Sequence, residues 1–446
     1  MTTLQERVHG ACPPKTWQLN KLHRVLRVRK GHKNTGMRES NLLSLSYGKI
    51  VNKDIDSSEG LLPESFETYQ LVEPGNIVMR LTDLQNDKRS LRQALVHERG
   101  IITSAYDALE VGADQDPRFW AYALLALDIA KYYYSLGGGV RQSIKFSDFP
   151  NDWIATPSLE VQRATSDFLD REIAKIEQLI DKKQQLINLL TVKRASHIYE
   201  TVTGRASKDV LSKKTGNAWF PILPDGWKLA RIKNVVTSIS DGPHISPEYV
   251  DEGIPFISAR NVKVDRWSLD DAKYISHELY REITKKSKPV RDDVLYTKGG
   301  TTGIARLVDL EFEFHIWVHV ALLKIRRSVA CPAYVAHTLN SSGCYAQSQL
   351  FTRGATNNDL GLNRMANICL PLPTLREQCT IVDRLNSSLI PIDKVRKSIE
   401  ASVERLREYR SSLITAAVTG QIDVATWTTQ VAKNNYPEQI EEAMRA

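Results

Sequence analysis

A short motif occurs twice in this chain of 446 residues and limits how the chain can fold. IYETVTG at 198–204 and ITAAVTG at 414–420 lie 216 positions apart. When the sequence is shifted by 216 positions, residues 159–204 and 375–420 are identical at 12 of 46 positions without a gap. A repeat of this size is too long for the unit of a solenoid protein, so we interpret it as a tandem duplication of a much larger unit.

Weaker matches occur in the same order in the two halves. PKTWQLNKL at 14–22 resembles PDGWKLARI at 224–232, and PRFWAYALLAL at 117–127 resembles PAYVAHTLN at 332–340. We therefore expect an α+β protein in which two mixed α/β domains are separated by two long helices, with a pseudo-twofold tandem duplication. The predicted segments are a first mixed domain at 1–150, spacer helix 1 at 151–210, a second mixed domain at 211–370, spacer helix 2 at 371–424 and a C-terminal tail at 425–446.

Local patterns predict a strand, a hairpin and a core helix within the mixed domains. EFEFHIWVHV at 311–320 alternates in a way that places Phe312, Phe314, Ile316, Val318 and Val320 on one face of a strand. GGTTGIAR at 299–306 has the glycines of a hairpin or loop tip, and it lacks the GK[ST] that a phosphate-binding loop requires. The apolar run at 119–134 is too short to span a membrane and predicts a core helix.

Each repeated segment has apolar residues at alternating steps of four and three, the period of a coiled-coil seam. The two predicted seams are Leu169, Ile173, Ile176, Ile180, Ile187 and Leu190, and Leu385, Leu389, Ile392, Ile399, Val403 and Leu406. Lys183 and Arg396 interrupt them. We expect the helices to return as an antiparallel coiled coil. A symmetric register would oppose these two cations, which favours an offset register or side chains that extend outward to solvent.

Signals for helix ends flank both segments. Thr374 and Glu377 have the spacing of a capping box, and Ser158 is placed to cap the first helix. Gly204 and Gly420 stand where a helix commonly ends on a glycine in the left-handed conformation. The repeated VTG is therefore interpreted as the end of the same helix, present twice.

Basic residues are concentrated near the N-terminus. Nine Lys or Arg and no Asp or Glu lie between Arg7 and Arg38, and the whole chain carries a net charge of +8. This pattern favours a phosphate-contacting surface over a merely solvated basic face. Three to four heptads span about 39 Å, close to the ~34–36 Å of one turn of B-DNA. Two domains at opposite ends of such a coil would be able to read one face of a duplex.

Other features exclude several classes of protein. The N-terminal MTTLQERVHG is polar and does not have the pattern of a signal peptide. The five cysteines are scattered, with neither metal-ligand spacing nor a disulfide framework. We expect a cytoplasmic protein without a metal, a cofactor or a membrane partner.

No catalytic motif is recognisable, because HExxH, GxSxG, a dinucleotide fingerprint and the Asn-Pro-Pro-aromatic tetrad of adenine methyltransferases are all missing. Cys331 and His337 are a weak candidate for a nucleophile pair. His315 and His319 would share a strand face with Trp317, which favours packing over metal ligation. We expect no catalytic residues.

At this point the sequence resembles a known family, the DNA-specificity subunits of type I restriction–modification systems. The resemblance is carried by LPLPTLREQCTIVDRL and YRSSLITAAVTGQIDV within 370–424, and by the diverged TPSLEVQRATSDFLDREIAKIEQLIDKKQQLINLL at 156–190. DGPHISPEYVDEGIPFISARNV at 241–262 resembles a segment of that family's target recognition domains. The resemblance covers about 15–424, which is nearly the whole chain.

The resemblance implies a non-catalytic subunit of a DNA methyltransferase and restriction endonuclease complex. The domains at 1–150 and 211–370 would be target recognition domains that each read one half of a gapped double-stranded DNA site, and the paired helices would fix the spacer. The implied partners are two methyltransferase (modification) subunits, docked on the helices, and two restriction/translocase subunits. Val161 stands where helix 2 has Glu377, so the two methyltransferase contacts are expected to differ.

Candidate DNA contacts are basic, amide and hydroxyl side chains in loop-like stretches. They are Arg24, Arg27, Arg29, Lys30, His32, Lys33 and Arg38 in the first domain, and His244, Arg260, Asn261, Lys298, Thr301, Thr302 and Arg306 in the second. Two other functions stay open on the sequence alone. One is a coiled-coil scaffold with two protein-binding domains, and the other is a stand-alone nuclease or methyltransferase.

Overall fold

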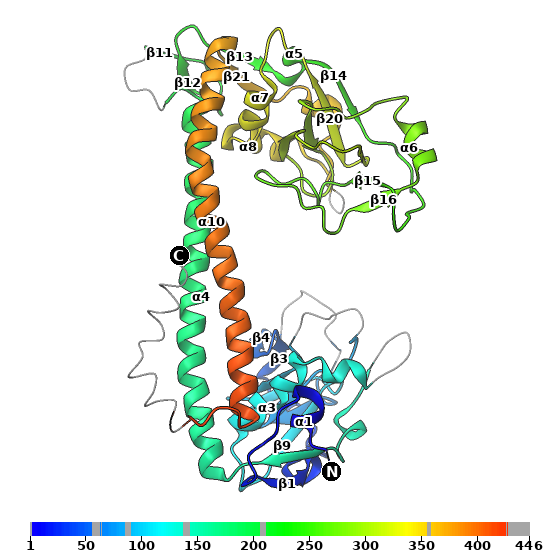
Figure 1. Ribbon diagram of the computed structural model, residues 1–446, viewed down its shortest axis with the longest axis vertical. Helices are drawn as coiled ribbons and strands as arrows, with labels where there is room; N and C mark the ends of the chain where they lie inside the picture. Colours follow the sequence, from blue (N-terminus) through cyan, green and yellow to red (C-terminus); the bar gives the residue numbers. More distant parts are fainter. Residues whose placement is uncertain are drawn as a thin grey trace. The chain divides into compact units, whose positions relative to one another are not determined.

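The computed structural model describes residues 2–55, 63, 65–84, 91–136, 143–205, 211–354, 358–424 and 426. Its contacts divide the chain into two compact units (Figure 1), of which unit 1 is Met1–Lys183 with Ala401–Ala446 and unit 2 is Gln184–Glu400. Each of the two long helical segments, 159–202 and 375–418, contributes residues to both units. Apart from Thr426, the predicted tail at 425–446 lies outside the described residues.

Unit 1 contains two four-stranded sheets, with strand orders β2-β9-β6-β7 and β4-β3-β8-β5, and a ribbon of β1 and β10. The helices α1, α2 and α3 accompany these sheets. The elements are α1 (Leu4–His9), β1 (Gln18–Lys21), α2 (Leu22–Val25), β2 (Leu26–Val28), β3 (Leu42–Ser46), β4 (Lys49–Lys53), β5 (Gln70–Val72), β6 (Ile77–Met79), β7 (Gln93–Leu95), β8 (Gly100–Ile102), β9 (Asp107–Val111), α3 (Pro117–Ile129) and β10 (Trp153–Thr156).

Unit 2 contains a four-stranded sheet of order β14-β20-β17-β18, a three-stranded sheet of order β16-β15-β19, and the two-stranded pairs β13-β21 and β11-β12. Its elements are β11 (Ser212–Lys214), β12 (Ile222–Pro224), β13 (Lys228–Arg231), α5 (Ile232–Val235), β14 (Val236–Asp241), β15 (Ile254–Ile257), β16 (Lys273–Ile275), α6 (His277–Ile283), β17 (Val294–Thr297), β18 (Ala305–Leu307), β19 (His315–Ile316), β20 (Val320–Ile325), α7 (Pro332–Leu339), α8 (Ser342–Phe351), α9 (Leu362–Met365) and β21 (Cys369–Leu372).

The predicted core helix at 119–134 is present as α3, but it ends at Ile129. Asp116 caps its first turn, since the carboxylate accepts a hydrogen bond from Arg118 N at 2.9 Å, and a proline follows at the start. Its apolar face is buried, with Trp120 completely inaccessible. Lys131 then adopts a left-handed conformation with φ 60°, which ends the helix before a short 3-10 turn.

The strand predicted over 311–320 is wrong. β19 covers only His315–Ile316, and a turn at Val318–His319 separates it from β20. Phe312 is 46% exposed while Phe314 is buried, so the two do not share an environment. The alternation is interrupted because Trp317 N donates to Ile257 O and Val320 N donates back to Trp317 O, both at 2.9 Å, which turns the chain between two different sheets.

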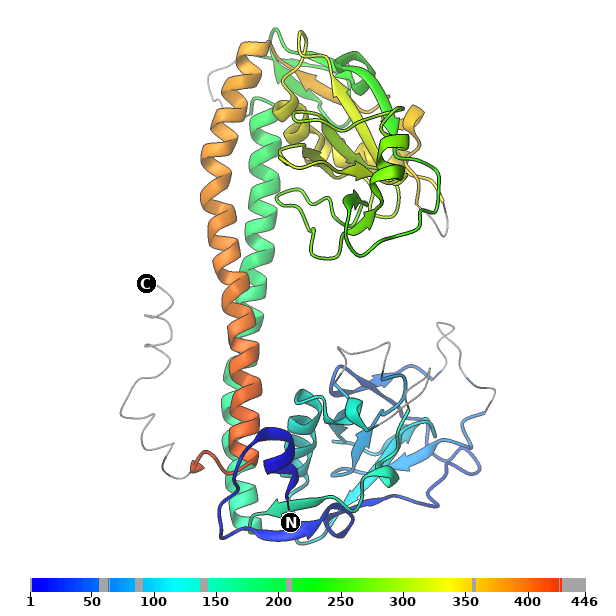
Figure 2. The ribbon, with the colours of Figure 1, turned by 45° about the vertical axis from the view of Figure 1, so that its right-hand side comes forward.

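The two long helices are α4 (Leu159–Val202) and α10 (Leu375–Val418), each of 44 residues. Within each unit they lie side by side (Figures 1 and 2). In unit 2, Arg194 donates to Asp393 at 3.0 Å and His197 contacts Ser388 at 2.6 Å, so the two segments run in opposite directions. In unit 1, Arg410 pairs with Glu177.

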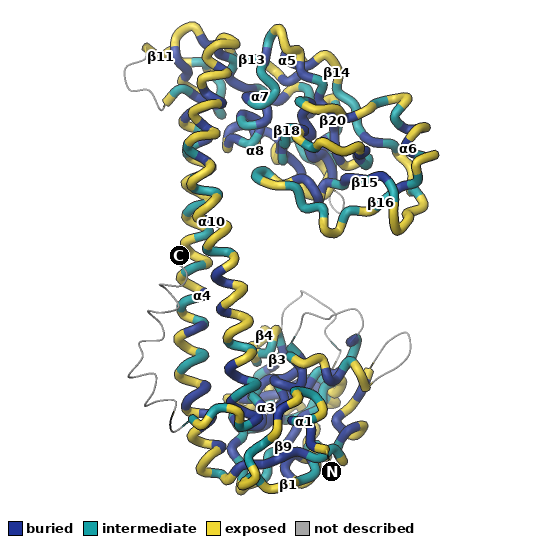
Figure 3. The backbone as a smooth tube through the Cα atoms, viewed as in Figure 1, coloured by how far each residue is buried: buried dark blue, intermediate teal, exposed yellow. Residues whose placement is uncertain are grey.

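Every predicted seam residue is buried or half-buried. Figure 3 shows buried stretches recurring between exposed ones along each helix. Burial of such a Leu or Ile side chain contributes about 1.5–3 kcal/mol. Within unit 2, Arg396 pairs with Asp265 of the domain, and with Asp393 and Glu400 of its own helix.

The predicted helix ends are confirmed. Thr374 and Glu377 form the capping box, with Glu377 Oε2 accepting from Thr374 N at 2.9 Å. Ser158 Oγ accepts from Val161 N at 3.4 Å. Gly204 and Gly420 have φ of 73° and 76°, the left-handed conformation that glycine adopts at low cost.

The helix-ending glycines also contact the domain of their own unit. A methyl group added at Gly204 would lie 2.2 Å from Pro224 Cγ, and one added at Gly420 would lie 2.4 Å from Pro14 Cδ. Trp227 and Trp17 complete the two contacts. Each domain is therefore attached closely to the C-terminal end of one long helix. Among the described residues, no helix combines the length and apolarity needed to cross a lipid bilayer.

We predict that Gly204→Ala lowers the free energy of unfolding by about 2–4 kcal/mol, because a left-handed alanine and a clash with a rigid proline ring add together. Gly226→Ala is the matched control, since Gly226 has φ 85° and open space around it, and it should cost only about 1–2 kcal/mol. Urea unfolding of the full chain measures both. Equal losses would contradict the close approach at Gly204.

Candidate nucleic-acid interface

The last part of the acid-free stretch, residues 29–38, forms a loop held along the edge strand β5. His32 O accepts from Leu71 N at 2.8 Å, and Asn34 N donates to Tyr69 O at 2.9 Å. The buried Asn34 side chain bonds to both backbone groups of Glu39, at 2.9 and 3.0 Å. These bonds fix the loop backbone and leave the candidates Lys30, His32, Lys33 and Arg38 exposed.

The other three candidates of unit 1 lie just before this loop or at its first residue. Arg24 on α2 and Arg27 on β2 are exposed. Arg29 differs, because it pairs with Glu110 of the neighbouring strand β9 at 2.9 Å and only 12% of its side chain is exposed. Six of the seven candidates are therefore accessible to a polyanion, and Arg29 is engaged in cross-strand pairing.

In unit 2, the candidates near the glycine loop have different environments. Lys298 is buried and pairs with Asp241 at 3.1 Å and Asp359 at 3.5 Å, so it holds three segments together. Thr302 is buried against Thr352 at 2.9 Å. Thr301 is exposed. The hairpin interpretation of 299–306 is confirmed, since β17 and β18 pair antiparallel on either side of the loop.

A second loop, residues 258–268, carries Arg260 and Asn261. The Asn261 amide is fully used inside the loop, because its Oδ1 accepts from Ser258 N and Oγ while its Nδ2 donates to Ser268 O. Arg260, the neighbouring residue, is exposed. Arg306 packs across the loop, with its guanidinium 4.8 Å from the Trp267 ring centroid, and it also pairs with Asp309.

His244 is 70% exposed and lies 3.1 Å from Asp241. The candidates thus fall into two groups. Those that are buried or half-buried and bonded within the protein, and so are not part of the proposed interface, are Arg29, Asn261, Lys298, Thr302 and Arg306. Those that remain exposed are Arg24, Arg27, Lys30, His32, Lys33, Arg38, His244, Arg260 and Thr301.

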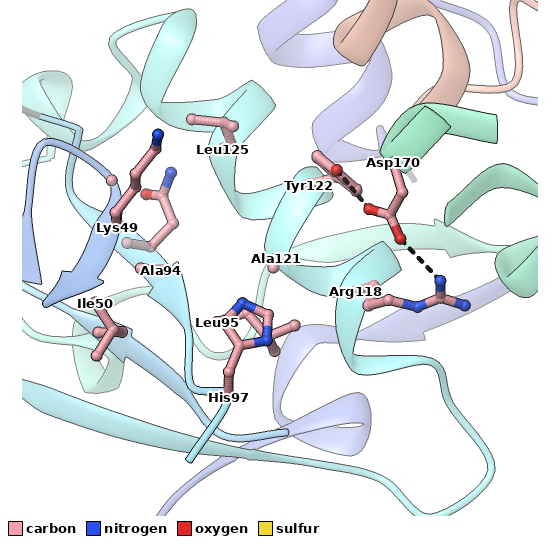
Figure 4. A pocket seen from close by; sticks show the side chains of 12 residues that line it. Lys49, Ile50, Ala94, Leu95, His97, Arg118, Ala121, Tyr122, Leu125 and Asp170 are labelled. Atoms are coloured by element: carbon pink, nitrogen blue, oxygen red, sulfur yellow. Dashed lines mark hydrogen bonds and ion pairs between the residues drawn. The ribbon is translucent and has the colours of Figure 1, made fainter. Parts of the chain in front are cut away.

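Ion pairs between the domains and the helices were not anticipated from the sequence. In unit 1, Arg118 of α3 bonds to Asp167 and Asp170 of α4, each at 2.8 Å, and Tyr122 donates to Asp170 at 2.7 Å. Figure 4 shows Arg118 and Tyr122 reaching Asp170 at one wall of a cavity of about 510 Å³. These ion pairs could not be predicted, because nothing in the sequence indicates that an Arg and an Asp about fifty positions apart will meet.

The side chains that the sequence offers as weak candidates for catalysis or metal binding make packing contacts and hydrogen bonds within the protein. Burial, with Arg194 as a second cause, lowers the pKa of His337 to about 4, and Asn386 bonds its ring. Cys331 lies beside Cys379 instead. His315 is buried, and its ring nitrogens contact Ile316 O and Ser287 O at 3.0 and 2.8 Å. No cluster of three or more metal-ligating side chains occurs among the described residues.

Comparison with known proteins gives a consistent family. Residues 224–405 match the family model described as the type I restriction modification DNA specificity domain. The EcoBI specificity subunit of Escherichia coli is 23% identical over 278 residues, which are 61% of this chain and 58% of that relative. The StySPI specificity subunit of Salmonella potsdam is 25% identical over 210 residues, which are 46% of this chain and 45% of that relative.

The chain spans about half the length of these two curated relatives. The MjaVIII specificity subunit of Methanocaldococcus jannaschii matches more extensively, with 20% identity over 442 residues, 94% of this chain and 96% of that relative. A chain in a solved structure, described in terms of complex assembly and conformational transition of the type I R-M system, has a TM-score of 0.56 at 17% identity, covering 92% of this chain and 100% of its own length. It shares the fold.

Residues 224–405 therefore match the type I restriction modification DNA specificity domain, and the chain is similar to the specificity subunits of type I restriction–modification systems.

Proposed function

We propose that this chain is the non-catalytic subunit that selects the DNA sequence for a type I restriction–modification complex. One domain in each unit reads one half of a bipartite, gapped DNA site. The single observation that carries this proposal is the match of residues 224–405 to the specificity domain. An exposed basic loop in the domain of unit 1 supports it. Phosphate contacts from that loop supply affinity, and base contacts in both domains supply specificity.

Matching contacts in the two units support a tandem duplication. Gln162 and Gln378 are completely buried at the starts of α4 and α10. Gln162 accepts from Asp116 N at 2.9 Å and donates to Pro157 O at 2.9 Å. Gln378 accepts from Cys331 N at 2.8 Å and donates to Pro373 O at 2.9 Å. In each unit this glutamine attaches the helix start to the residues around the start of a domain helix, α3 or α7.

The sheets support the same proposal. The β1-β10 pair of unit 1 and the β13-β21 pair of unit 2 both join the start of a domain to its end. The order β2-β9-β6-β7 corresponds to β14-β20-β17-β18 when each strand is taken in chain order within its unit. We infer a pseudo-twofold duplication, in which each domain connects the end of one long helix with the start of the other.

The helix contacts support an antiparallel coiled-coil spacer. The seam residues are buried or half-buried, and opposed pairs within each unit are linked by Arg194–Asp393 and by Arg410–Glu177. In an antiparallel pair of helices, the numbers of opposed residues have the same sum all along one register. Both ion pairs give the sum 587, so one offset register accounts for them. A spacer of fixed length would set the number of unread base pairs between the half-sites.

The helices also offer surfaces for partner subunits. In unit 2, Leu186, Leu189 and Val192 of α4 are 43%, 63% and 66% exposed, and Ile390 and Val395 of α10 are 65% and 49% exposed. Apolar side chains repeated along a helix face suit a partner helix. We propose that two methyltransferase subunits dock on the helices and that two restriction/translocase subunits join the assembled complex.

Mapping of methylated adenine tests the proposed function. We predict that this chain, expressed with its neighbouring methyltransferase subunit in a methylation-free host, produces one gapped two-part motif that disappears when the chain is omitted. The motif would give both half-sites and the gap. A stable complex without a motif would instead favour a coiled-coil scaffold with two protein-binding domains.

Arg260→Ala tests direct readout by the second domain. We predict a loss of about 1–3 kcal/mol in DNA affinity with relaxed preference at one position of one half-site, because an exposed Arg suits guanine O6 and N7. Arg281→Ala, an exposed Arg on α6, is the control and should change neither. Selection from randomised half-sites measures the preference. A uniform loss across sequences with a shallower salt dependence would identify a phosphate contact instead.

Leu189→Asp tests docking on the helices. We predict that it weakens association with the methyltransferase subunit about thirtyfold, or ~2 kcal/mol, because a charge would replace an anchoring apolar contact. Asn188→Asp adds the same charge at the preceding residue, which is also exposed, and should have little effect. Titration calorimetry with the purified methyltransferase subunit measures both. Equal weakening by the two variants would contradict an apolar docking face at Leu189.

A further inference from the structure

We propose that Asp265 and Arg396 form a positioning pair that fixes the 258–268 loop of the second domain on α10 and thereby sets the gap between the two half-sites. The proposal rests on the proposed function, because the gap has meaning only if each domain reads DNA. All residues involved lie within unit 2.

Arg396 occupies a position in the apolar seam of α10 and is 9% exposed. It pairs directly with Asp265 of the loop, with Glu400 at 2.6 Å and with Asp393 at 3.9 Å. Asp393 in turn holds Arg194 of α4 at 3.0 Å. The charge network therefore links both helices to one loop of the recognition domain.

A buried ion pair is poor evidence for stability, since apolar side chains of similar volume often stabilise as well or better. A buried polar group in a coiled-coil seam more typically fixes register and arrangement. Arg396 interrupts the seam at a position where Leu or Ile would pack. Its partner Asp265 is on the domain and not on the opposite helix, which indicates that the arrangement it fixes is that of the loop on the helix.

Bonds within the 258–268 loop hold it together, so we expect it to shift as a rigid unit. Asn261 bonds across it to Ser268, and Val262 and Trp267 form an isolated β-bridge. Trp267 donates to Asp309 at 2.6 Å, which ties the loop to the segment after β18. A shift at Asp265 would therefore be transmitted to the exposed candidate Arg260 at the start of the same loop.

Apolar packing between loop and helices is incomplete. A cavity of about 350 Å³ separates them, lined by Thr191 and Ala195 of α4, Val264 of the loop, and Thr301 beside it. Arg396 and Asp265 also line this cavity. The charge pair thus bridges a space that side chains do not fill, so its removal would leave the loop and its domain without a directional contact to α10.

The test separates position from stability by using a double variant. Asp265→Asn leaves Arg396 without its domain partner, and that single change also carries a cost in folding. Asp265→Leu combined with Arg396→Met replaces the pair by apolar side chains, which should fold but lack a directional contact. Asp270→Asn and Lys397→Gln change matching charges at exposed positions nearby and serve as controls.

The readout is methylation of reporter sites whose half-sites are separated by the native gap, one base pair fewer or one base pair more. A displacement of about 3.4 Å corresponds to one base pair. We expect the double variant to unfold at the temperature of the unaltered chain, yet to methylate the altered gaps roughly tenfold more, relative to the native gap. Asp265→Glu, which retains the ion pair, should keep the gap preference of the unaltered chain.

The outcomes are distinguishable. If the unaltered chain yields no bipartite motif, the proposed function fails, whatever the variants do. If it yields the motif and the double variant keeps the gap preference of the two controls, the positioning proposal is overturned. Thermal unfolding of all variants identifies loss of fold, and an unfolded Asp265→Asn protein alongside a folded double variant with a relaxed gap supports the proposal.

Discussion

Burial of one apolar face on each long helix is the constraint on which the rest of this protein depends. In unit 2, Ile198 and Val202 of α4 and Leu385 and Leu389 of α10 belong to the same buried cluster as the strands of the domain sheet and α7. The domain and its two helical segments therefore share one core. A sheet of short strands could not bury both of its faces alone, and the helices supply the missing cover.

The polar contacts decide how each domain is fixed on that apolar face. Gln162 and Gln378 are buried amides that accept from the start of a domain helix and donate to a proline carbonyl two residues before their own helix. Because leaving a buried amide unsatisfied is costly, these bonds favour the observed placement of the domain. Arg118 with Asp170 in unit 1, and Arg396 with Asp265 in unit 2, add charged contacts at different places. The two units thus share an attachment and differ in how it is reinforced.

Surface loops carry the residues that are proposed to contact DNA, and their backbones are held from within. Asn34 and Asn261 both have the amide chemistry suited to adenine, yet both bond to their own loops. The exposed basic side chains beside them remain available. This arrangement suits recognition, since a loop that is already ordered loses little conformational entropy when it binds.

How much the sequence predicts depends on whether the signal is local. The 3.5-residue period, the Thr374–Glu377 capping box and the glycines at 204 and 420 are local patterns, and the helices begin and end where these patterns placed them. The strand expected at 311–320 failed because Trp317 bonds to Ile257, a residue of a distant strand, and the chain turns there. Asn261 was expected on the surface because sequence cannot distinguish an amide that faces solvent from one that closes its own loop.

The sequence by itself determined that the chain contains two similar long helices, because helix periodicity and capping depend on residues within a few turns of one another. It also determined that one stretch is strongly basic. Only the tertiary structure decided which basic and amide side chains are exposed, that Arg396 meets Asp265, and that each domain closes on the end of one helix and the start of the other. Those outcomes depend on contacts between residues of different elements, such as Arg396 and Asp265, which are 131 positions apart. There, charge and burial are settled by packing and not by neighbours in sequence.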